Sequence, residues 1–318
     1  MTPWPSECIG FANNGMMAPM RTTPHIQQPQ AEVDITPELV RALLQAQHPD
    51  LSHASIQPVD AGWDNAVFRL GPQLAVRLPR RLAAAELLVK EQMWLPQLAP
   101  QLPLPVPTPV RVGRPGEGYP WQWSVVPWLA GVPADLCAAD REQGATLAAF
   151  FRALHVPARE NAPLNTWRGV PLSDRRAVVE QRMHRLGSET KAIIERIEDL
   201  WSRALAAPLD APPTWLHGDL HSQNVLVEGG KLSAVIDWGD LCQGDRASDL
   251  AAVWMLLGDV DAREAAIHLS PGVSESTWTR ARGWAIFFGV LMSDMGLAGN
   301  ARHGAAGKLT LARLVEGP

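Results

Sequence analysis

The 318-residue sequence contains few cysteines, no long run of one charge and no apolar run of membrane-spanning length. Its three cysteines, Cys8, Cys137 and Cys242, form no CxxC pair and are odd in number. This pattern argues against a disulfide scaffold or a zinc knuckle and favours a reduced, cytoplasmic protein. The first thirty residues lack a basic start followed by an apolar block, so they do not resemble a signal peptide.

The longest apolar candidate, "WAIFFGVLM" at residues 284–292, has about half of the roughly 18 residues that a membrane helix needs. We therefore expect a buried helix segment there and no membrane partner. The formal net charge is −5 and charges of both signs are interspersed, so the basic footprint of a nucleic-acid-binding protein is missing. The composition is thus that of an ordinary globular protein, for which we expect a monomer or a homodimer.

The order of the sequence patterns predicts two lobes behind a disordered tail. We expect the tail at residues 1–33, a small strand-rich lobe at 34–130 that ends in a hinge, and a larger helical lobe at 131–318. In the first lobe, Thr36 and Pro37 mark a helix start. The other expected elements there are a hairpin at 66–70 and 74–79, a helix at 83–98 and a strand at 121–129.

The second lobe reads as helical with one polar hairpin. Apolar periodicity predicts helices at 141–155, 172–187, 188–207 and 247–257. The exception is "VLVEGGKLSAVIDWGD" at 225–240, which reads as two short strands around a Gly-Gly turn. The fold class that follows is α+β, with a β-rich N-lobe and a helical C-lobe.

The polar residues around this hairpin have the spacing that phosphoryl transfer requires. "WLHGDLHSQNVLV" at 215–227 supplies His217, Asp219 and Asn224, and the second strand is followed by Asp237. The hairpin places Asn224 and Asp237 at the same end, where their oxygens suit Mg²⁺. Asp219 would face the acceptor hydroxyl. At roughly 1 in 20 per position, a chance match of this joint pattern is improbable.

"HGDLHSQN" followed by "VIDWGD" resembles the aminoglycoside phosphotransferase family, the bacterial relatives of protein kinases. The resemblance runs from about residue 35 and implies a bilobal protein-kinase-like fold that uses ATP and Mg²⁺. It implies that Asp219 is the catalytic base and that Asn224 and Asp237 are metal ligands. His217 would brace the catalytic loop, and Asp249 in "ASDLA" would pin that loop from the next helix. A plain charge at a helix start is the alternative for Asp249.

The resemblance also implies a cation on the third strand of the N-lobe, paired with a carboxylate on the next helix. Arg77 in "LAVRLP" stands where many relatives have lysine, and its fork of donors suits phosphate oxygens. Glu91 is the first candidate partner and Glu86 the second. Either glutamate could instead be a solvated helix charge.

Two further segments would complete the nucleotide site. The phosphate-covering loop is expected at 60–70, where Asp64 and Asn65 lie at a turn and Gly62 replaces a glycine-rich motif. The adenine is expected against "SVVPWLAG", with backbone groups near Val126 and Trp128 as partners. Trp128 could equally be a core residue.

Two rival interpretations of the motif stay open. His217 and His221 form a His-x-Asp-x-His pattern that could hold zinc in a hydrolase, although no fourth ligand has recognisable spacing. The unusual Arg77 and the glycine-poor loop are also compatible with a non-catalytic nucleotide-binding module. Against that, Asp219, Asn224 and Asp237 are all present.

The acceptor is a hydroxylated small molecule whose identity is left open. An aminoglycoside would need an acidic pocket, for which Asp240, Asp245, Asp259 and Asp261 are candidates, although helix caps and surface charges explain them equally well. "LAVRLPRR" resembles macrolide phosphotransferases, which would make the protein an antibiotic-resistance enzyme. An amino alcohol, a sugar or a ribose derivative is the alternative, because fold and motif do not determine the pocket.

Overall fold

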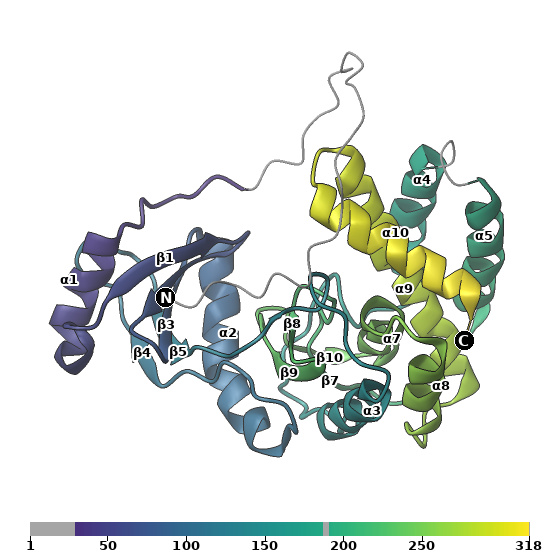
Figure 1. Cartoon of the computed structure of the whole chain (residues 1–318), viewed down its shortest axis with the longest axis horizontal. Helices are drawn as coiled ribbons and strands as arrows, with labels where there is room; N and C mark the ends of the chain where they lie inside the picture. The colour runs from purple at the N-terminus through teal and green to yellow at the C-terminus, as the bar shows by residue number, and fades with distance from the viewer. Residues whose placement is uncertain (1–28, 187–190, 318) are drawn as a thin grey trace, which may run out of the picture.

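The computed structural model describes residues 29–186 and 191–317. Its N-terminal lobe is built on a five-stranded antiparallel sheet (Figure 1). The strand order is β1-β2-β3-β5-β4. The strands are β1 (Ile56–Ala61), β2 (Asn65–Leu70), β3 (Leu74–Pro79), β4 (Arg111–Gly113) and β5 (Trp123–Pro127). The hairpin predicted at 66–70 and 74–79 is therefore β2–β3, and its turn contains Gly71 in the left-handed region (φ 59°).

Two helices accompany this sheet. Helix α1 (Pro37–Gln47) begins as predicted, with Thr36 Oγ1 accepting from Leu39 N–H at 3.3 Å, and it packs its apolar residues on the sheet. Helix α2 (Leu82–Leu98) runs between the sheet and the C-lobe (Figure 1), and its C-terminal half joins the C-lobe core. There the Trp94 and Trp215 rings lie 5.0 Å apart. A short helix η2 (Pro49–Leu51) follows α1, and η3 (Ala99–Gln101) follows α2.

The C-terminal lobe is mainly helical and contains the larger core. Its helices are α3 (Gln143–Leu154), η4 (Leu172–Arg175), α4 (Arg176–Leu186), α5 (Lys191–Ala206), α6 (Ala247–Leu250), α7 (Ala252–Leu256), α8 (Val260–His268), α9 (Glu275–Leu297) and α10 (Ala301–Glu316). The apolar segment 284–292 lies in α9 and is buried almost throughout, as predicted. In the described part of the chain, no helix combines the length and hydropathy that a bilayer span requires.

The polar hairpin of the C-lobe is β8 (Val225–Glu228) and β9 (Lys231–Val235), joined at Gly229 and Gly230. Both glycines have positive φ, 55° and 77°, which is the backbone of a tight hairpin turn. Strand β6 (Val132–Pro133) pairs with β8, and β7 (Thr214–Leu216) pairs with β10 (Cys242–Gly244). The β7–β10 pairing brings the segment that precedes the hairpin beside the segment that follows it.

Some predicted boundaries differ from the structure. Residues 1–28 of the predicted tail, and 188–190 of the helix predicted at 188–207, lie outside the described residues. Glu32 N–H donates to Arg80 O at 2.8 Å, and a Glu32 carboxylate oxygen accepts from Leu82 N–H at 3.1 Å. The structure thus places Glu32 with the N-lobe, before the predicted boundary at residue 34.

Candidate active site

The segment between β7 and β8 forms a loop with little room for side-chain movement. His217 is completely buried, and its Nε2 lies 3.0 Å from Ile236 O while its Nδ1 accepts from Asp219 N–H at 3.2 Å. The Trp238 ring packs edge-on against this imidazole at 4.7 Å. Burial lowers the pKa of His217 below its usual value, although the Asp249 charge opposes this. The imidazole is thus a neutral support inside the loop.

Asp249 of α6 holds the start of the same loop. Its Oδ2 accepts from His217 N–H at 2.7 Å and its Oδ1 accepts from Gly218 N–H at 2.9 Å. Gly218 has φ 87°, and a Cβ there would lie 2.4 Å from Asp240 O, so this position requires glycine. The completely buried Asp249 side chain also lies 3.3 Å from His155 Nε2. Such contacts suit the pinning role predicted for Asp249 better than a helix-start charge.

Asp219 points into a cluster of polar side chains rather than into open solvent. Arg168 Nη2 donates to Asp219 Oδ1 at 2.7 Å, and His221 Nε2 lies 3.2 Å from Oδ2. Burial alone would raise the pKa of Asp219, but Arg168 and then His221 outweigh it and hold this pKa below its usual range. Asp219 is therefore an ionised hydrogen-bond acceptor.

Asn224 and Asp237 meet at the base of the β8–β9 hairpin. Ile236 N–H donates to Asn224 O at 2.8 Å, and this bond joins the two strand ends, as we predicted from the hairpin pattern. The Asn224 amide nitrogen donates to Asp219 O at 2.9 Å, so its amide oxygen is on the opposite side. Asp237 adopts the left-handed region with φ 62°, an uncommon backbone for a residue other than glycine. Its side chain stays 55% accessible.

Arg77 and Glu91 connect the N-lobe to this cluster. Arg77 Nη1 donates to Glu91 Oε1 at 2.5 Å, and the Glu91 side chain is completely buried. Arg77 Nη2 lies 3.7 Å from Asp237 Oδ1, so one guanidinium faces carboxylates of both lobes. Glu86, the second candidate partner, is exposed to solvent. Burial raises the pKa of Glu91, and the Arg77 charge offsets this only in part.

The predicted phosphate-covering loop is the turn between β1 and β2. The Asp64 carboxylate accepts from Arg81 Nη2 at 2.6 Å, so it anchors the loop rather than approaching a phosphate. Asn65 begins β2, and its buried Oδ1 lacks a hydrogen-bond partner among the described residues. Gly62 N–H donates to Asn65 O at 3.0 Å, which closes the turn. Backbone N–H groups of this turn are the remaining candidates for phosphate contact.

The predicted adenine contacts need one correction. Val126 is buried in β5 opposite Ala75 of β3. Trp128 N–H donates to Gln73 O at 2.7 Å, so this donor extends the β3–β5 pairing and is not free to bind a base. The Trp128 ring is covered by the Arg69 guanidinium at 4.5 Å. The pairing of Trp128 N–H could not be predicted from spacing along the sequence. The register between β3 and β5 determines which N–H groups of this segment bond to the neighbouring strand.

The residues at the hairpin base fit Mg²⁺ and do not fit zinc. Magnesium usually takes one or two protein oxygens, and Asn224 and Asp237 offer one each. Partial desolvation by the surrounding protein raises the pKa of Asp237, and Arg77 opposes this. Asp219, Asp64 and Asp240 raise it further, so a divalent cation would relieve crowded negative charge. Both His217 ring nitrogens face backbone groups, and no cluster of three or more His, Cys, Asp or Glu among the described residues is arranged around a metal.

Of the four candidate pocket aspartates, the structure brings only Asp240 to the site. Asp245 accepts from Arg280 Nε at 2.7 Å, Asp259 caps α8 through Ala262 N–H at 3.0 Å, and Asp261 pairs with Arg141. Three of the four are therefore structural, as helix caps or ion pairs. The acidic pocket expected for an aminoglycoside does not form from them.

Sequence reasoning missed the segment that covers Asp219. Asn165 and Arg168 belong to the irregular stretch between α3 and η4, about fifty residues before Asp219. Asn165 Oδ1 accepts from Trp167 N–H at 2.7 Å and Arg168 N–H at 3.1 Å, while its amide nitrogen donates to Asp240 Oδ1 at 2.7 Å. The only sequence signal is a Trp-Arg-Gly triplet in a stretch without periodicity.

Comparisons with known proteins identify the family of this chain and its fold. The model of the phosphotransferase enzyme family matches residues 55–284, which include every predicted site residue. A homoserine kinase of Zymomonas mobilis subsp. mobilis is 36% identical over 69 residues. That match spans only 22% of this chain and 20% of the kinase.

Solved structures share the whole fold at low identity. The GDP and kanamycin complex of APH(2")-IIia superimposes with a TM-score of 0.64 and 18% identity, over 87% of this chain and 98% of the other. The macrolide 2'-phosphotransferase MphH from Brachybacterium faecium superimposes with a TM-score of 0.58 and 23% identity, over 86% and 98%. At these identities the superpositions establish the bilobal kinase-like architecture.

Proposed function

Because the chain belongs to the phosphotransferase enzyme family, we propose that it transfers the γ-phosphoryl group of ATP to a hydroxyl of a small molecule, with Mg²⁺. The observation that carries this proposal is the meeting of Asp219, Asn224 and Asp237 at one end of the β8–β9 hairpin, facing the Arg77–Glu91 pair of the other lobe. Phosphoryl transfer depends mainly on positioning and charge stabilisation, which is what such a cluster supplies.

Each side chain has a distinct proposed task. Asp219 accepts the hydrogen bond of the acceptor hydroxyl, orients its oxygen and takes its proton. Asn224 and Asp237 hold Mg²⁺, which when bound neutralises charge on the phosphates. Arg77, positioned by Glu91, binds phosphate oxygens. His217 and Asp249 keep the loop that carries Asp219 in place.

The comparisons support the use of a nucleotide, but they are compatible with more than one class of acceptor. Relatives of the same fold have been crystallised with GDP and with ADP. One of them was crystallised in a complex with GDP and kanamycin, whereas the partial sequence match is to a homoserine kinase. An antibiotic-resistance role in the cytoplasm is one candidate activity, and phosphorylation of a hydroxylated metabolite is the other. Asp245, Asp259 and Asp261 make structural contacts instead of lining an acidic pocket, which weighs against a polycationic antibiotic as the acceptor.

The test is a coupled ATP-consumption assay with Mg²⁺ and a panel of aminoglycosides, macrolides, amino alcohols and hydroxylated acids. We expect acceptor-dependent turnover in the wild type and a loss of about a hundredfold or more in Asp219→Ala, with nucleotide affinity largely retained. Normal turnover in Asp219→Ala would contradict the role of this residue. Nucleotide binding without turnover of any acceptor would favour the non-catalytic module instead.

A further inference from the structure

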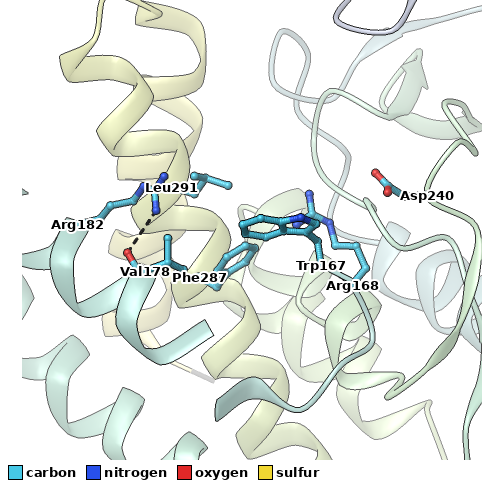
Figure 2. A pocket seen from close by; sticks show the side chains of 7 residues that line it. All are labelled: Trp167, Arg168, Val178, Arg182, Asp240, Phe287 and Leu291. Atoms are coloured by element: carbon cyan, nitrogen blue, oxygen red, sulfur yellow. Dashed lines mark hydrogen bonds between the residues drawn. The ribbon is translucent and has the colours of Figure 1, made fainter. Parts of the chain in front are cut away.

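A cavity of about 270 Å³ opens between the segment 165–169, Asp240 and helices α4 and α9 (Figure 2). Arg168 lines this cavity and donates to Asp219 Oδ1 at 2.7 Å, so the Arg168 side chain connects the cavity to the proposed catalytic carboxylate. The cavity volume lies just below the roughly 300–1,000 Å³ typical of ligand sites. A compact acceptor fits this space better than a large antibiotic does.

The middle of the cavity is apolar and aromatic. Trp167, Phe287 and Leu291 line it, with Val178 of α4 beside them (Figure 2). The Arg168 guanidinium lies over the Phe288 ring at 4.8 Å, which fixes its plane. Walls of this kind bind a flat or aliphatic body through burial of apolar surface.

The end of the cavity away from Asp240 is cationic. Figure 2 shows Arg182 on one side of the aromatic residues and Asp240 on the other. Arg182 Nε donates to Asp294 Oδ2 at 3.1 Å, but Arg185 already binds both oxygens of that carboxylate, at 2.8 and 2.6 Å. Within residues 29–186 and 191–317, Arg182 Nη2 has no hydrogen-bond partner.

Arg168 is also incompletely paired. Its Nη2 binds Asp219, whereas its Nε is buried and lacks a partner among the residues that the structure describes. A buried guanidinium N–H without a partner is costly, and an acceptor oxygen of a bound ligand would satisfy it. Two guanidinium groups with unused donors therefore face one small apolar cavity, against a single lining carboxylate.

We propose that this cavity is the acceptor site and that it selects a small alcohol carrying an anionic group, such as a carboxylate, on an apolar body. The hydroxyl lies at the Asp219 end, the body lies between Trp167 and Phe287, and the anionic group binds the free donors of Arg182. This inference rests on the proposed phosphotransferase function and names its substrate class. It separates the protein from relatives whose acceptors are polyammonium compounds.

Three matched probes test the charge preference. 4-(Hydroxymethyl)benzoate, its neutral amide and the cationic 4-(aminomethyl)benzyl alcohol share a primary alcohol and a flat apolar body. We expect kcat/KM for the carboxylate to exceed that for the other two by about tenfold or more, as one charge-assisted hydrogen bond allows. Equal or better turnover of the amide or the amine would overturn the inference.

The chain offers a matched pair of variants. Arg182→Met and Arg185→Met each remove one guanidinium partner of Asp294, but only Arg182 lines the cavity. We expect the carboxylate preference to fall to about threefold or less in Arg182→Met and to persist in Arg185→Met. The same loss in both variants would mean that Asp294, and not the anion contact, produces the preference, and would overturn the inference.

Ligand-detected NMR in the presence of a non-hydrolysable ATP analogue separates this inference from the proposed function. Tighter binding of the carboxylate than of the amide supports the inference even where turnover is absent, and equal binding or no binding of the carboxylate overturns it. Asp219-dependent phosphorylation of cationic acceptors alone would leave the proposed function standing and remove this inference. Absence of nucleotide binding would instead count against the proposed function.

Discussion

His217 shows at the scale of one residue how burial sets a protonation state. Its ring is completely buried, and its neutral form accepts at Nδ1 from Asp219 N–H and donates from Nε2 to Ile236 O. Protonation would place a second donor opposite Asp219 N–H, so the folded state resists it. Burial lowers the pKa of His217, and the hydrogen bond that Nδ1 accepts favours the neutral ring as well.

This lowered pKa predicts a pH-dependent contribution to stability. Unfolded histidine takes up a proton near pH 6.5, whereas folded His217 does so only at lower pH, so acid favours the unfolded chain. As the pH falls through about 6.5, the wild type should lose up to about 1.4 kcal/mol of unfolding free energy per pH unit from this group. His217→Asn should lack that component, so urea titrations from pH 8 to 5 should show the wild-type advantage shrinking. A constant difference would contradict this account.

Arg77 is the second residue whose chemistry the structure explains. One nitrogen binds Glu91 at 2.5 Å while another faces Asp237 at 3.7 Å, and lysine has a single nitrogen for both tasks. We expect Arg77→Lys to fold, because it keeps the charge beside Glu91, but to lose about tenfold in kcat/KM for ATP. Steady-state kinetics with the melting temperature as a folding control would check this. Undiminished kcat/KM would show that the fork is dispensable.

At the scale of elements, the segment 165–169 is a positioning element for the acceptor site. Asn165 caps the N–H groups of Trp167 and Arg168 and donates to Asp240. Gly169 has φ 65° and lies so close to Gly244 that an added Cβ would be 3.0 Å from its Cα. The segment therefore rests on β10 and holds Arg168 over Asp219.

Asn165→Ala should loosen this segment without touching the nucleotide side. We expect the KM of the acceptor to rise by about tenfold, because three hydrogen bonds that orient Trp167 and Arg168 are lost, while the KM of ATP changes by less than about twofold. Asn161→Ala, at an exposed position a few residues before this segment, is the matched control and should leave both constants unchanged. A rise in the KM of ATP alone would contradict the positioning role.

Local patterns explain which elements could be predicted. The β2–β3 and β8–β9 hairpins carry glycine turns between apolar strands, and α1 starts at a threonine cap followed by proline, so each signal lies within a few residues. Strand β1 was not predicted, because "IQPVDA" contains proline and aspartate and pairs with β2 through a shift in register.

The contacts of the site likewise divide into those that local sequence predicts and those that it does not. Asn224 and Asp237 flank the β8–β9 hairpin and Asp219 lies in the loop that leads into it, so their proximity follows from local structure. The Arg77–Glu91 pair follows from a strand joined directly to a helix. Arg168 reaches Asp219 from fifty-one residues away, and Trp128 N–H is directed by strand register. Both depend on tertiary packing, which spacing along the chain does not encode.

At the scale of the whole molecule, the site is shared by two lobes with separate cores. The N-lobe core packs α1 on the sheet, and the larger core includes the end of α2. Helix α2 thus carries Glu91 to Arg77 of the N-lobe sheet and Trp94 into the C-lobe core, next to Trp215. A ligand that contacts Arg77 and Asp237 together should stabilise the contact between the lobes.

Binding of ATP with Mg²⁺ should therefore raise the unfolding midpoint of the wild type. A ligand at one hundred times its Kd adds about 2.7 kcal/mol to the folded state. Removing Mg²⁺ with a chelator should abolish most of this gain, because Asp237, the pKa of which is raised by partial desolvation and by neighbouring carboxylates, would then face the phosphates without a cation.

Asp237→Ala should melt at the same temperature with and without Mg²⁺ in the presence of ATP, because the proposed metal ligand is gone. Asp261→Ala, which removes a surface carboxylate paired with Arg141, should keep the full Mg²⁺-dependent shift. Thermal unfolding with ATP, with and without chelator, compares the three proteins directly. A Mg²⁺-dependent shift that survives in Asp237→Ala would place the metal elsewhere. Loss of the shift in Asp237→Ala alone would tie the nucleotide metal to the hairpin of the C-lobe, and through Arg77 to the sheet of the other lobe.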